Sequence, residues 1–305
     1  MEKKTVKKIC FVVNPMAASG KAHDQIEWIW RSAQKRWDHV SLFLTNKEGR
    51  VSELSNGEEK EFDMIIACGG DGTIHRVINQ FADSRVPFGV LPLGSGNDFV
   101  KSCHLPTKLS DHFDMWLDGT TRPLDLVKIS GDANGWAVNT IGLGLDGMAN
   151  YYAHKGKALP GKFQPGKTRY TIGAILAALR SSAHSMTLKL DDTELSESLL
   201  MTTICNGKIE GGDFHLSPDS NLFDGRLELA TLSHLPFLKL LFTLPKFKKG
   251  VPENLPQYKI RPFRSLTIRS KAPLHVHADG EHLGATIRTL TLDVVPGKVD
   301  LAVLH

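Results

Sequence analysis

Short apolar runs alternate with longer mixed segments in the first part of the chain. Residues 9–13, 40–45, 64–67 and 88–93 are rich in Val, Ile, Leu and Phe, a composition typical of buried strands. Segments near 24–36, 74–81 and 111–117 have the length and mixed polarity of helices that cover a sheet. The alternation predicts an α/β domain built on a parallel sheet, which we place at residues 1–122.

Beyond residue 123, apolar and polar residues alternate with a period of two. The pattern recurs at 124–129, 136–141, 187–190, 199–205, 226–230, 266–269 and 290–295, and it predicts antiparallel strands with one buried face. One predicted helix, near 170–182, interrupts them. We therefore predict a C-terminal antiparallel β-sandwich domain at residues 123–297. The final strand, within residues 298–305, could close this domain or return to the first one.

Composition and charge narrow the classes of protein that the chain could represent. Lys and Arg number 37 against 33 Asp and Glu, a net charge of +4, which does not favour nucleic acid but suits an anionic ligand or membrane surface. Four cysteines without paired spacing argue against a disulfide framework, and no apolar run is long enough to span a bilayer. We expect a cytoplasmic protein that meets a membrane only at its surface.

A glycine-rich turn follows the third predicted strand. It reads Gly69-Gly70-Asp71-Gly72-Thr73 and leads into a predicted helix. Glycine lets the backbone approach a ligand closely, and the N–H groups at a helix start favour an anion such as phosphate. Asp71, among those N–H groups, suits a metal or water ligand beside a nucleotide. The alternative is a tight turn in which Asp71 caps the helix.

Two further loops of small residues follow neighbouring predicted strands. The first runs from Asn14 and ends in Ser19-Gly20-Lys21, and the second is Gly94-Ser95-Gly96-Asn97-Asp98-Phe99. Thr45 ends the second predicted strand, where its hydroxyl could reach a nucleotide. Because the carboxyl ends of parallel strands meet at one edge of a sheet, we expect these loops to form a single phosphate-binding site.

These loops, taken in order, resemble the catalytic domain of the diacylglycerol kinase and sphingosine kinase family, especially the soluble lipid kinases of bacteria. The likeness continues through the second half of the chain, in Asn139, Gly142-Leu143-Gly144-Leu145-Asp146, Asn206, Gly211-Gly212, Ser217-Pro218-Asp219, Phe223-Asp224-Gly225 and Asp279-Gly280-Glu281. The resemblance implies an N-terminal nucleotide domain similar to those of NAD kinases and phosphofructokinases, followed by a β-sandwich.

The resemblance also implies roles for individual residues. ATP would be bound through Asn14, Thr45, the turn from Gly70 to Arg76, and Ser95. Asp279 would be the base that takes the proton from a lipid hydroxyl, with Glu281 beside it. A Mg²⁺ ion in the second domain would use Asp224, together with backbone oxygens near Asn221 and Arg226.

Some of these positions have a second interpretation. Arg76 and Phe223 stand where relatives often carry an acid, which reverses one charge near the phosphates and removes one carboxylate from the metal region. Asp279-Gly280 is also a common hairpin turn. His275 and His277 share one face of a strand, but without a third ligand at metal spacing they fit better as histidines lining a core or a cleft.

Three functions remain open at this point. The first is an ATP- and Mg²⁺-dependent kinase of diacylglycerol or a related lipid, the second a kinase of a soluble nucleotide like NAD kinase, and the third a nucleotide-binding regulator without catalysis. Apolar residues and lysines mix within residues 235–249, so this segment could lie on an anionic membrane or pack on the sandwich as a short helix. The sequence leaves open whether the chain forms a homodimer.

Overall fold

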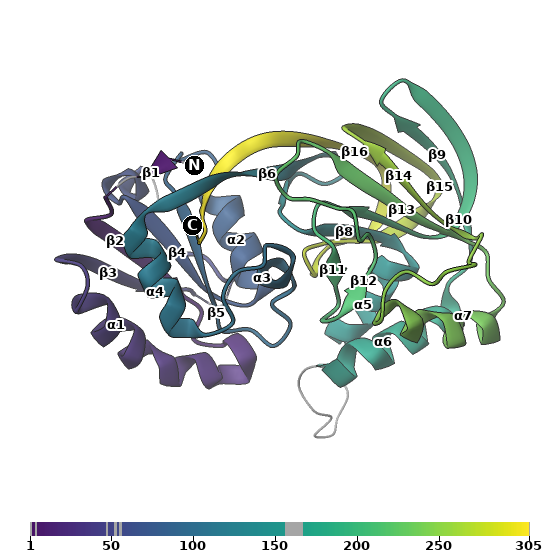
Figure 1. Cartoon of the computed structure of the whole chain (residues 1–305). Coiled ribbons are helices and arrows are strands. Elements are labelled where there is room, and N and C mark those ends of the chain that lie inside the picture. The colour runs from purple at the N-terminus through teal and green to yellow at the C-terminus, as the bar shows by residue number, and fades with distance from the viewer. Residues whose placement is uncertain are drawn as a thin grey trace. The chain divides into compact units, whose positions relative to one another are not determined.

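The computed structural model describes residues 2–3, 5–46, 48–51, 54, 57–155 and 167–304. The chain forms two compact units (Figure 1): unit 1 comprises Met1–Asp125 and Pro296–His305, and unit 2 comprises Leu126–Val295. It passes between the units within two long strands, β6 (Thr120–Gly131) and β16 (Glu281–Ala302). The predicted fold class, an α/β domain followed by an antiparallel β domain, is confirmed.

Unit 1 alternates strands and helices. In chain order its elements are β1 (Glu2–Lys3), β2 (Lys8–Val13), η1 (Ala17–Gln25), α1 (Ile26–Gln34), β3 (His39–Leu44), η3 (Glu58–Glu61), β4 (Met64–Gly69), α2 (Asp71–Phe81), β5 (Phe88–Pro92), α3 (Asp98–Ser102) and α4 (Leu109–Asp118).

The sheet of unit 1 is parallel, with the strand order β3-β2-β4-β5 and the end of β16 beside β5. The chain starts this sheet at β2, adds β3 on one side and then returns to add β4 on the other. In such sheets the loops beside the first strand diverge and leave a crevice at its carboxyl end, where ligands bind. The topology therefore directs attention to the loops after β2 and β4.

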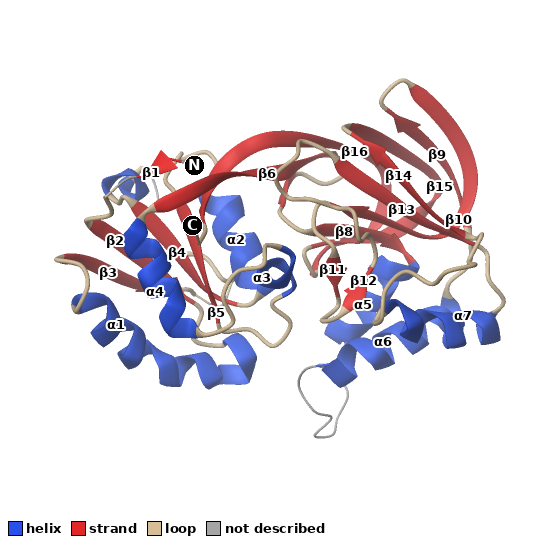
Figure 2. Ribbon diagram, viewed as in Figure 1, coloured by secondary structure: helices blue, strands red, loops and turns tan. Residues whose placement is uncertain are grey.

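Aromatic residues join the helices to one face of this sheet. Phe113 of α4 lies 5.9 Å from Phe11 of β2 and 5.4 Å from Trp28 of α1, measured between ring centroids. Helices α1 and α4 therefore share one face. Helix α2 covers the other (Figure 2), as right-handed crossovers that run in opposite directions require.

Unit 2 is built mainly of antiparallel strands. Its further elements are β7 (Gly135–Ala137), β8 (Thr140–Gly144), α5 (Leu145–Lys155), α6 (Lys167–Arg180), β9 (His184–Leu190), β10 (Thr193–Cys205), β11 (Ile209–Glu210), β12 (Phe214–His215), β13 (Leu227–Ser233), α7 (Phe237–Thr243), η5 (Leu244–Phe247), β14 (Tyr258–Phe263) and β15 (Ser265–Ala278).

Two long strands contribute to both layers of the sandwich. The first half of β10 pairs with β9 and its second half with β8 and β13, while β15 pairs first with β9 and then with β8. The register shifts within both strands, after Leu199 and after Arg269. Irregularities of this kind let a strand bend from one layer into the other.

Alternation along the strands divides the interior of unit 2 into two cores. On β10, Ile204 faces the core between the layers, whereas Cys205 faces a second core beneath the helices. We call the second one the helix-side core; it includes Ala177 of α6 and Leu240 of α7. The sheet β14-β13-β10-β8-β15 is thus buried on both faces.

The sequence pattern missed several details. Helix α2 begins at Asp71, three residues before the predicted start, so Asp71, Gly72 and Thr73 form its first turn, with Gly70 at the N-cap position. The predicted strand at 136–141 is two strands, β7 and β8, with a sharp turn between them. Helix α5 was not predicted, because Gly144 and Gly147 interrupt its apolar pattern.

Candidate active site

The structure brings the predicted nucleotide loops of unit 1 together at one edge of the sheet. Backbone hydrogen bonds join each strand end to its neighbour. The Asn14 N–H donates to Cys68 O at 3.0 Å, the Thr45 N–H to Val13 O at 2.9 Å, and the Leu93 N–H to Gly69 O at 2.9 Å. The loops after β2, β3, β4 and β5 therefore start side by side.

Glycine is required where the loops after β4 and β5 touch. A Cβ atom on Gly94 would lie 2.4 Å from the Cα atom of Gly70, and one on Gly69 would lie 2.2 Å from the Thr73 hydroxyl. Both distances are far below van der Waals contact, so a side chain on Gly94 would force the two loops apart and one on Gly69 would displace Thr73. The two turns thus present backbone rather than side chains, as a phosphate cradle needs.

Asp71 links these two loops. Its Oδ1 accepts a hydrogen bond from the Phe99 N–H at 3.1 Å. Its Oδ2 faces Gly96, where a Cβ atom would lie 3.2 Å from Asp71 Oδ2 and 3.7 Å from Asp98 Oδ2. Two carboxylates therefore approach the same backbone segment, and hard carboxylate oxygens suit Mg²⁺, which binds few carboxylates and keeps several waters.

Asn97 and Asp98, in the loop after β5, have structural partners. Asn97, in the left-handed conformation with φ 54°, accepts a hydrogen bond from Gly94 N–H at 3.1 Å and donates one to Gly94 O at 3.1 Å. Asp98 forms an ion pair with Lys101 at 3.5 Å. Ser95 is exposed at the tip of the turn, where its hydroxyl is accessible to a ligand.

Asn14 and Thr45 differ in how their side chains are used. Asn14 donates to the Thr73 hydroxyl at 3.1 Å and accepts from the Met16 N–H at 3.0 Å, so it braces the loop after β2 against α2. The Thr45 hydroxyl is buried and has no hydrogen-bond partner among the described residues. Because a buried hydroxyl without a partner is costly, this atom fits a site that a bound nucleotide completes.

The loop after β2 carries an unusual backbone. Ala18, Ser19 and Gly20 follow one another in the left-handed region, with φ of 50°, 61° and 93°. Ala and Ser pay about 1 kcal/mol each for this conformation. Lys21 follows and is exposed. The strained turn and the accessible cation agree with an anion-binding role for this loop.

Arg76 lies on α2. Its side chain covers Gly49 in the loop after β3, where a Cβ atom would lie 2.4 Å from Arg76 Cδ. The need for glycine at position 49 comes from its backbone, with φ of 76° in the left-handed region, since the flexible Arg76 side chain can move aside.

In unit 2, Asp279 and Gly280 form the tight turn between β15 and β16, with φ of 50° and 83°. Left-handed values at both positions define a two-residue hairpin turn, and Glu281 begins the next strand. Asp279 is only 6% exposed. Its carboxylate accepts three backbone N–H groups: Oδ1 from Asn139 at 2.7 Å and Thr140 at 3.1 Å, and Oδ2 from Val138 at 3.0 Å. The carboxylate is therefore held in one orientation.

Two asparagines fix the segment that binds this carboxylate. The Asn139 side chain donates to Ile209 O at 2.8 Å, and the Asn206 side chain donates to Val138 O at 2.8 Å. The backbone N–H groups of Asn206 and Gly207 both donate to Asn139 O at 2.9 Å. These residues thus position the N–H groups around Asp279.

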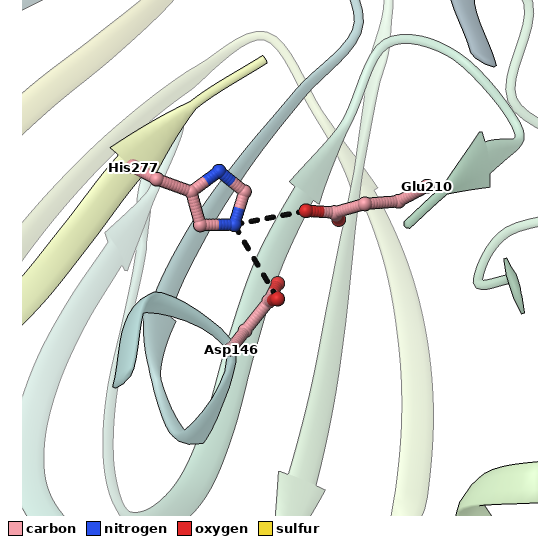
Figure 3. Close-up of side chains that lie close together, drawn as sticks. All are labelled: Asp146, Glu210 and His277. Carbon is pink, nitrogen blue, oxygen red and sulfur yellow. Dashed lines mark ion pairs between the residues drawn. The ribbon is translucent and has the colours of Figure 1, made fainter. Parts of the chain in front are cut away.

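A cluster of the buried His277 with the half-buried Glu210 and Asp146 lies next to this turn. His277 Nε2 is 2.8 Å from Glu210 Oε1 and 3.3 Å from Asp146 Oδ1, and the Thr203 hydroxyl donates to Asp146 Oδ2 at 2.7 Å. Figure 3 shows both carboxylates pointing toward the same ring nitrogen from separate segments of the chain. A Cβ atom on Gly142 would lie 2.3 Å from this nitrogen, so glycine makes room for the cluster.

The tautomer of His277 favours a hydrogen-bonded cluster over a metal centre. The Gly280 N–H donates to His277 Nδ1 at 3.3 Å, which puts the proton of the neutral ring on Nε2, facing the carboxylates. A cation at Nε2 would require that proton on Nδ1, against the Gly280 N–H. The three side chains could otherwise surround a cation, since their ligand atoms all lie within 4.8 Å of one another.

The cluster also shifts the affinity of its members for protons. Burial lowers the pKa of His277, but the charges of Glu210 and Asp146 raise it by more, so the net pKa lies well above the usual value. Burial, and then the charge of Asp146, raise the pKa of Glu210. The raised pKa of His277 favours the doubly protonated ring, in which Nδ1 carries a proton and cannot accept from Gly280, so the Gly280 hydrogen bond belongs to the neutral ring alone. The charge of the cluster is therefore coupled to the turn that carries Asp279.

The predicted metal region of unit 2 is an exposed acidic turn. Asn221 and Asp224 each accept a backbone N–H with their own side chains, from Phe223 at 3.2 Å and from Arg226 at 3.0 Å. Burial, and then the charges of Asp219 and Asp224, raise the pKa of Glu228. Sequence reasoning did not single out Glu228, which adds a carboxylate near the turn.

Sequence reasoning also missed the His277 cluster. It noted His277 and quoted Asp146 within a longer motif, but Glu210 stood outside every motif. The three residues come from β15, α5 and β11, so their spacing along the chain carries no signal.

The comparisons with known proteins agree with this architecture. Residues 8–129 match the diacylglycerol kinase catalytic domain, and residues 139–303 match the YegS C-terminal NAD kinase beta sandwich-like domain. Diacylglycerol kinases of Staphylococcus epidermidis and Mycobacterium tuberculosis are each 27% identical to the chain, over 82% of it and 78% of the former, and over 90% of it and 88% of the latter.

Solved structures share the fold across the full length. The crystal structure of a putative diacylglycerol kinase from Bacillus anthracis has a TM-score of 0.80 at 20% identity and covers 99% of both chains. Yeast NADH kinase complexed with NADH has a TM-score of 0.55 at 11% identity, covering 99% of this chain and 85% of that one.

The fold is NAD kinase-like, and the family matches and the relatives place the chain among the kinases. The chain belongs to the diacylglycerol kinase catalytic-domain family. None of the described helices combines the length and apolar composition needed to cross a bilayer.

Proposed function

We propose that the protein is an ATP- and Mg²⁺-dependent lipid kinase that transfers the γ-phosphate to a hydroxyl of diacylglycerol or a related lipid. The observation that carries the proposal is the Asp279 carboxylate, buried and held by three backbone N–H groups, in a chain of the diacylglycerol kinase family. A general base must be held in a defined position to remove a proton from an alcohol.

Phosphoryl transfer depends on positioning and on neutralising charge rather than on covalent chemistry. In our proposal, the N–H groups of the turns at Gly70 and Gly94 bind the ATP phosphates, and the Thr45 hydroxyl completes the nucleotide site. Asp71 and Asp98 would hold Mg²⁺ through water, and the ion would neutralise phosphate charge. Asp279 would accept the proton of the lipid hydroxyl.

A second candidate is phosphorylation of a soluble nucleotide. The likeness of the fold to yeast NADH kinase favours it, although that likeness is weaker than the one to the Bacillus anthracis structure. A third candidate is a nucleotide-binding regulator, which Arg76 and Phe223 leave open because they replace acids common in the family.

The test is transfer of labelled γ-phosphate from ATP to lipids in mixed micelles. The panel contains diacylglycerol, sphingosine, ceramide, phosphatidylglycerol and undecaprenol, with NAD as the soluble control. We expect label on one lipid and none in the Asp279→Asn variant. Label on NAD would replace the proposal with the second candidate, and ATP binding without label on any acceptor would favour the third.

A further inference from the structure

Helices α6 and α7 cover the same face of the unit 2 sheet. Ala177 and Ala178 of α6 and Leu240 of α7 all belong to the helix-side core, and Figure 1 shows the two helices beside each other under that sheet. The faces of α6 and α7 that do not contact the helix-side core therefore lie on the same side of unit 2 and point outward.

Those outer faces carry large apolar side chains. Ile175 and Leu179 of α6 are 39% and 59% exposed, and Leu238 and Phe242 of α7 are 67% and 72% exposed. Each pair is spaced four residues apart, so it forms a stripe along its helix. Residues 177 and 240 fall about half a turn away, on the buried face, because an α-helix rotates about 100° per residue.

Exposed cations lie on these helices and in the residues just after α7. Arg180, Lys239, Lys246, Lys248 and Lys249 are exposed. Residues 167–182 and 235–249 contain no Asp or Glu. We call the four apolar residues and these five cations the α6–α7 surface.

We propose that the α6–α7 surface binds an anionic lipid bilayer, with the apolar stripes entering the interface and the cations contacting lipid phosphates. Exposed apolar helix faces flanked by Lys and Arg are typical of helices that lie in a membrane interface. A second copy of the chain is a poorer occupant, because a two-fold interface would bring like charges together. The inference goes beyond the proposed function and does not depend on which acceptor is phosphorylated.

The test is binding of the full chain to sedimented vesicles, with no ATP present. Vesicles of phosphatidylcholine with phosphatidylglycerol are compared with phosphatidylcholine alone, and we expect binding only to the former. Each Lys near an anionic surface strengthens binding about fivefold. Reversing Lys246, Lys248 and Lys249 to Glu should therefore weaken binding on the order of 100-fold. The double variant Leu238→Ser and Phe242→Ser should weaken it at least about tenfold.

Matched control variants distinguish an effect of the α6–α7 surface on vesicle binding from an effect of net charge or of unfolding. Lys7, Lys35 and Lys60 are exposed lysines of unit 1. Replacing these three by Glu changes the net charge as much as the α6–α7 triple does, and it should leave most of the vesicle binding intact. Leu44→Ser with Leu117→Ser removes apolar residues that are 48% and 43% exposed elsewhere and should have little effect. Circular dichroism checks that each variant is folded.

Two results would overturn the inference. One is equal weakening by the two lysine triples, which would show that only net charge matters. The other is self-association of the wild type that is lost in the Leu238 and Phe242 variant while vesicle binding persists, which would assign the surface to a second copy. Loss of kinase activity on every lipid, with vesicle binding intact, would count against the proposed function alone.

Discussion

Replacement of Asp279 by Asn tests the arrangement around the proposed base. Asn tolerates the left-handed backbone at this position at least as well as Asp, so the hairpin turn should survive. The substitution changes one carboxylate oxygen into an NH₂ group. Both oxygens of Asp279 accept hydrogen bonds from backbone N–H groups. Whichever oxygen the NH₂ group replaces, it therefore faces at least one backbone N–H, which is also a donor.

The size of the effect follows from those bonds. In the better orientation the amide oxygen keeps Asn139 and Thr140, and the NH₂ group faces the Val138 N–H, 3.0 Å from the oxygen it replaces. One hydrogen bond to a charged acceptor is lost, worth roughly 1.5–3 kcal/mol, and the remaining two are weakened. We expect the free energy of unfolding to fall by about 2–4 kcal/mol.

Urea unfolding of the Asp279→Asn variant measures this loss. Asp191 is the matched control, since it also has a left-handed backbone, φ 48°, and accepts two backbone N–H groups, but it is exposed and uses Oδ1 for both. Asp191→Asn keeps that oxygen and should change stability little. Equal stability of wild type and Asp279→Asn would refute the three-bond arrangement.

Kinase activity must be compared under conditions in which both proteins are folded. Equal activity of wild type and Asp279→Asn there would refute the proposed role of Asp279 as the base.

Three further predictions concern packing, pH and thiols. Gly94→Ala should lower the free energy of unfolding by about 1–3 kcal/mol in urea, because its Cβ atom would meet the backbone of Gly70, which cannot rotate away; unchanged stability would mean that the two loops do not touch. Burial lowers the pKa of His112, so the unfolded chain takes up the proton first as pH falls. The wild type should therefore lose stability as pH falls through about 6.5, and its advantage over His112→Gln should shrink there; a constant difference would contradict the assignment. Burial raises the pKa of Cys10 to about 12 and that of Cys68 well above its usual value. Ellman's reagent should label these thiols only after unfolding, and rapid labelling of the folded chain would show that they are accessible.

The meeting of the loops after β2, β4 and β5 at one sheet edge could be predicted from sequence because their determinants are local. Each consists of an apolar strand, a turn with glycine, and a helix start, and the parallel alternation of strands and helices brings such loops to one edge. The roles of individual side chains were less visible. Asn97 was predicted to belong to the nucleotide site, and the structure adds that its side chain holds Gly94. Whether Thr45 would have a partner for its hydroxyl could not be judged without the packing around it.

Only the tertiary structure determined the surroundings of Asp279. The Asp279-Gly280 sequence specifies a hairpin turn, and it does so in the structure. The N–H groups that hold the carboxylate come from a turn far away in the chain, and the cluster of His277, Glu210 and Asp146 joins three separate elements. Sequence patterns report which residues lie on one face of a strand or helix. They do not report which distant segments share that face, because strand pairing and the bends in β10 and β15 decide it through packing of the whole unit.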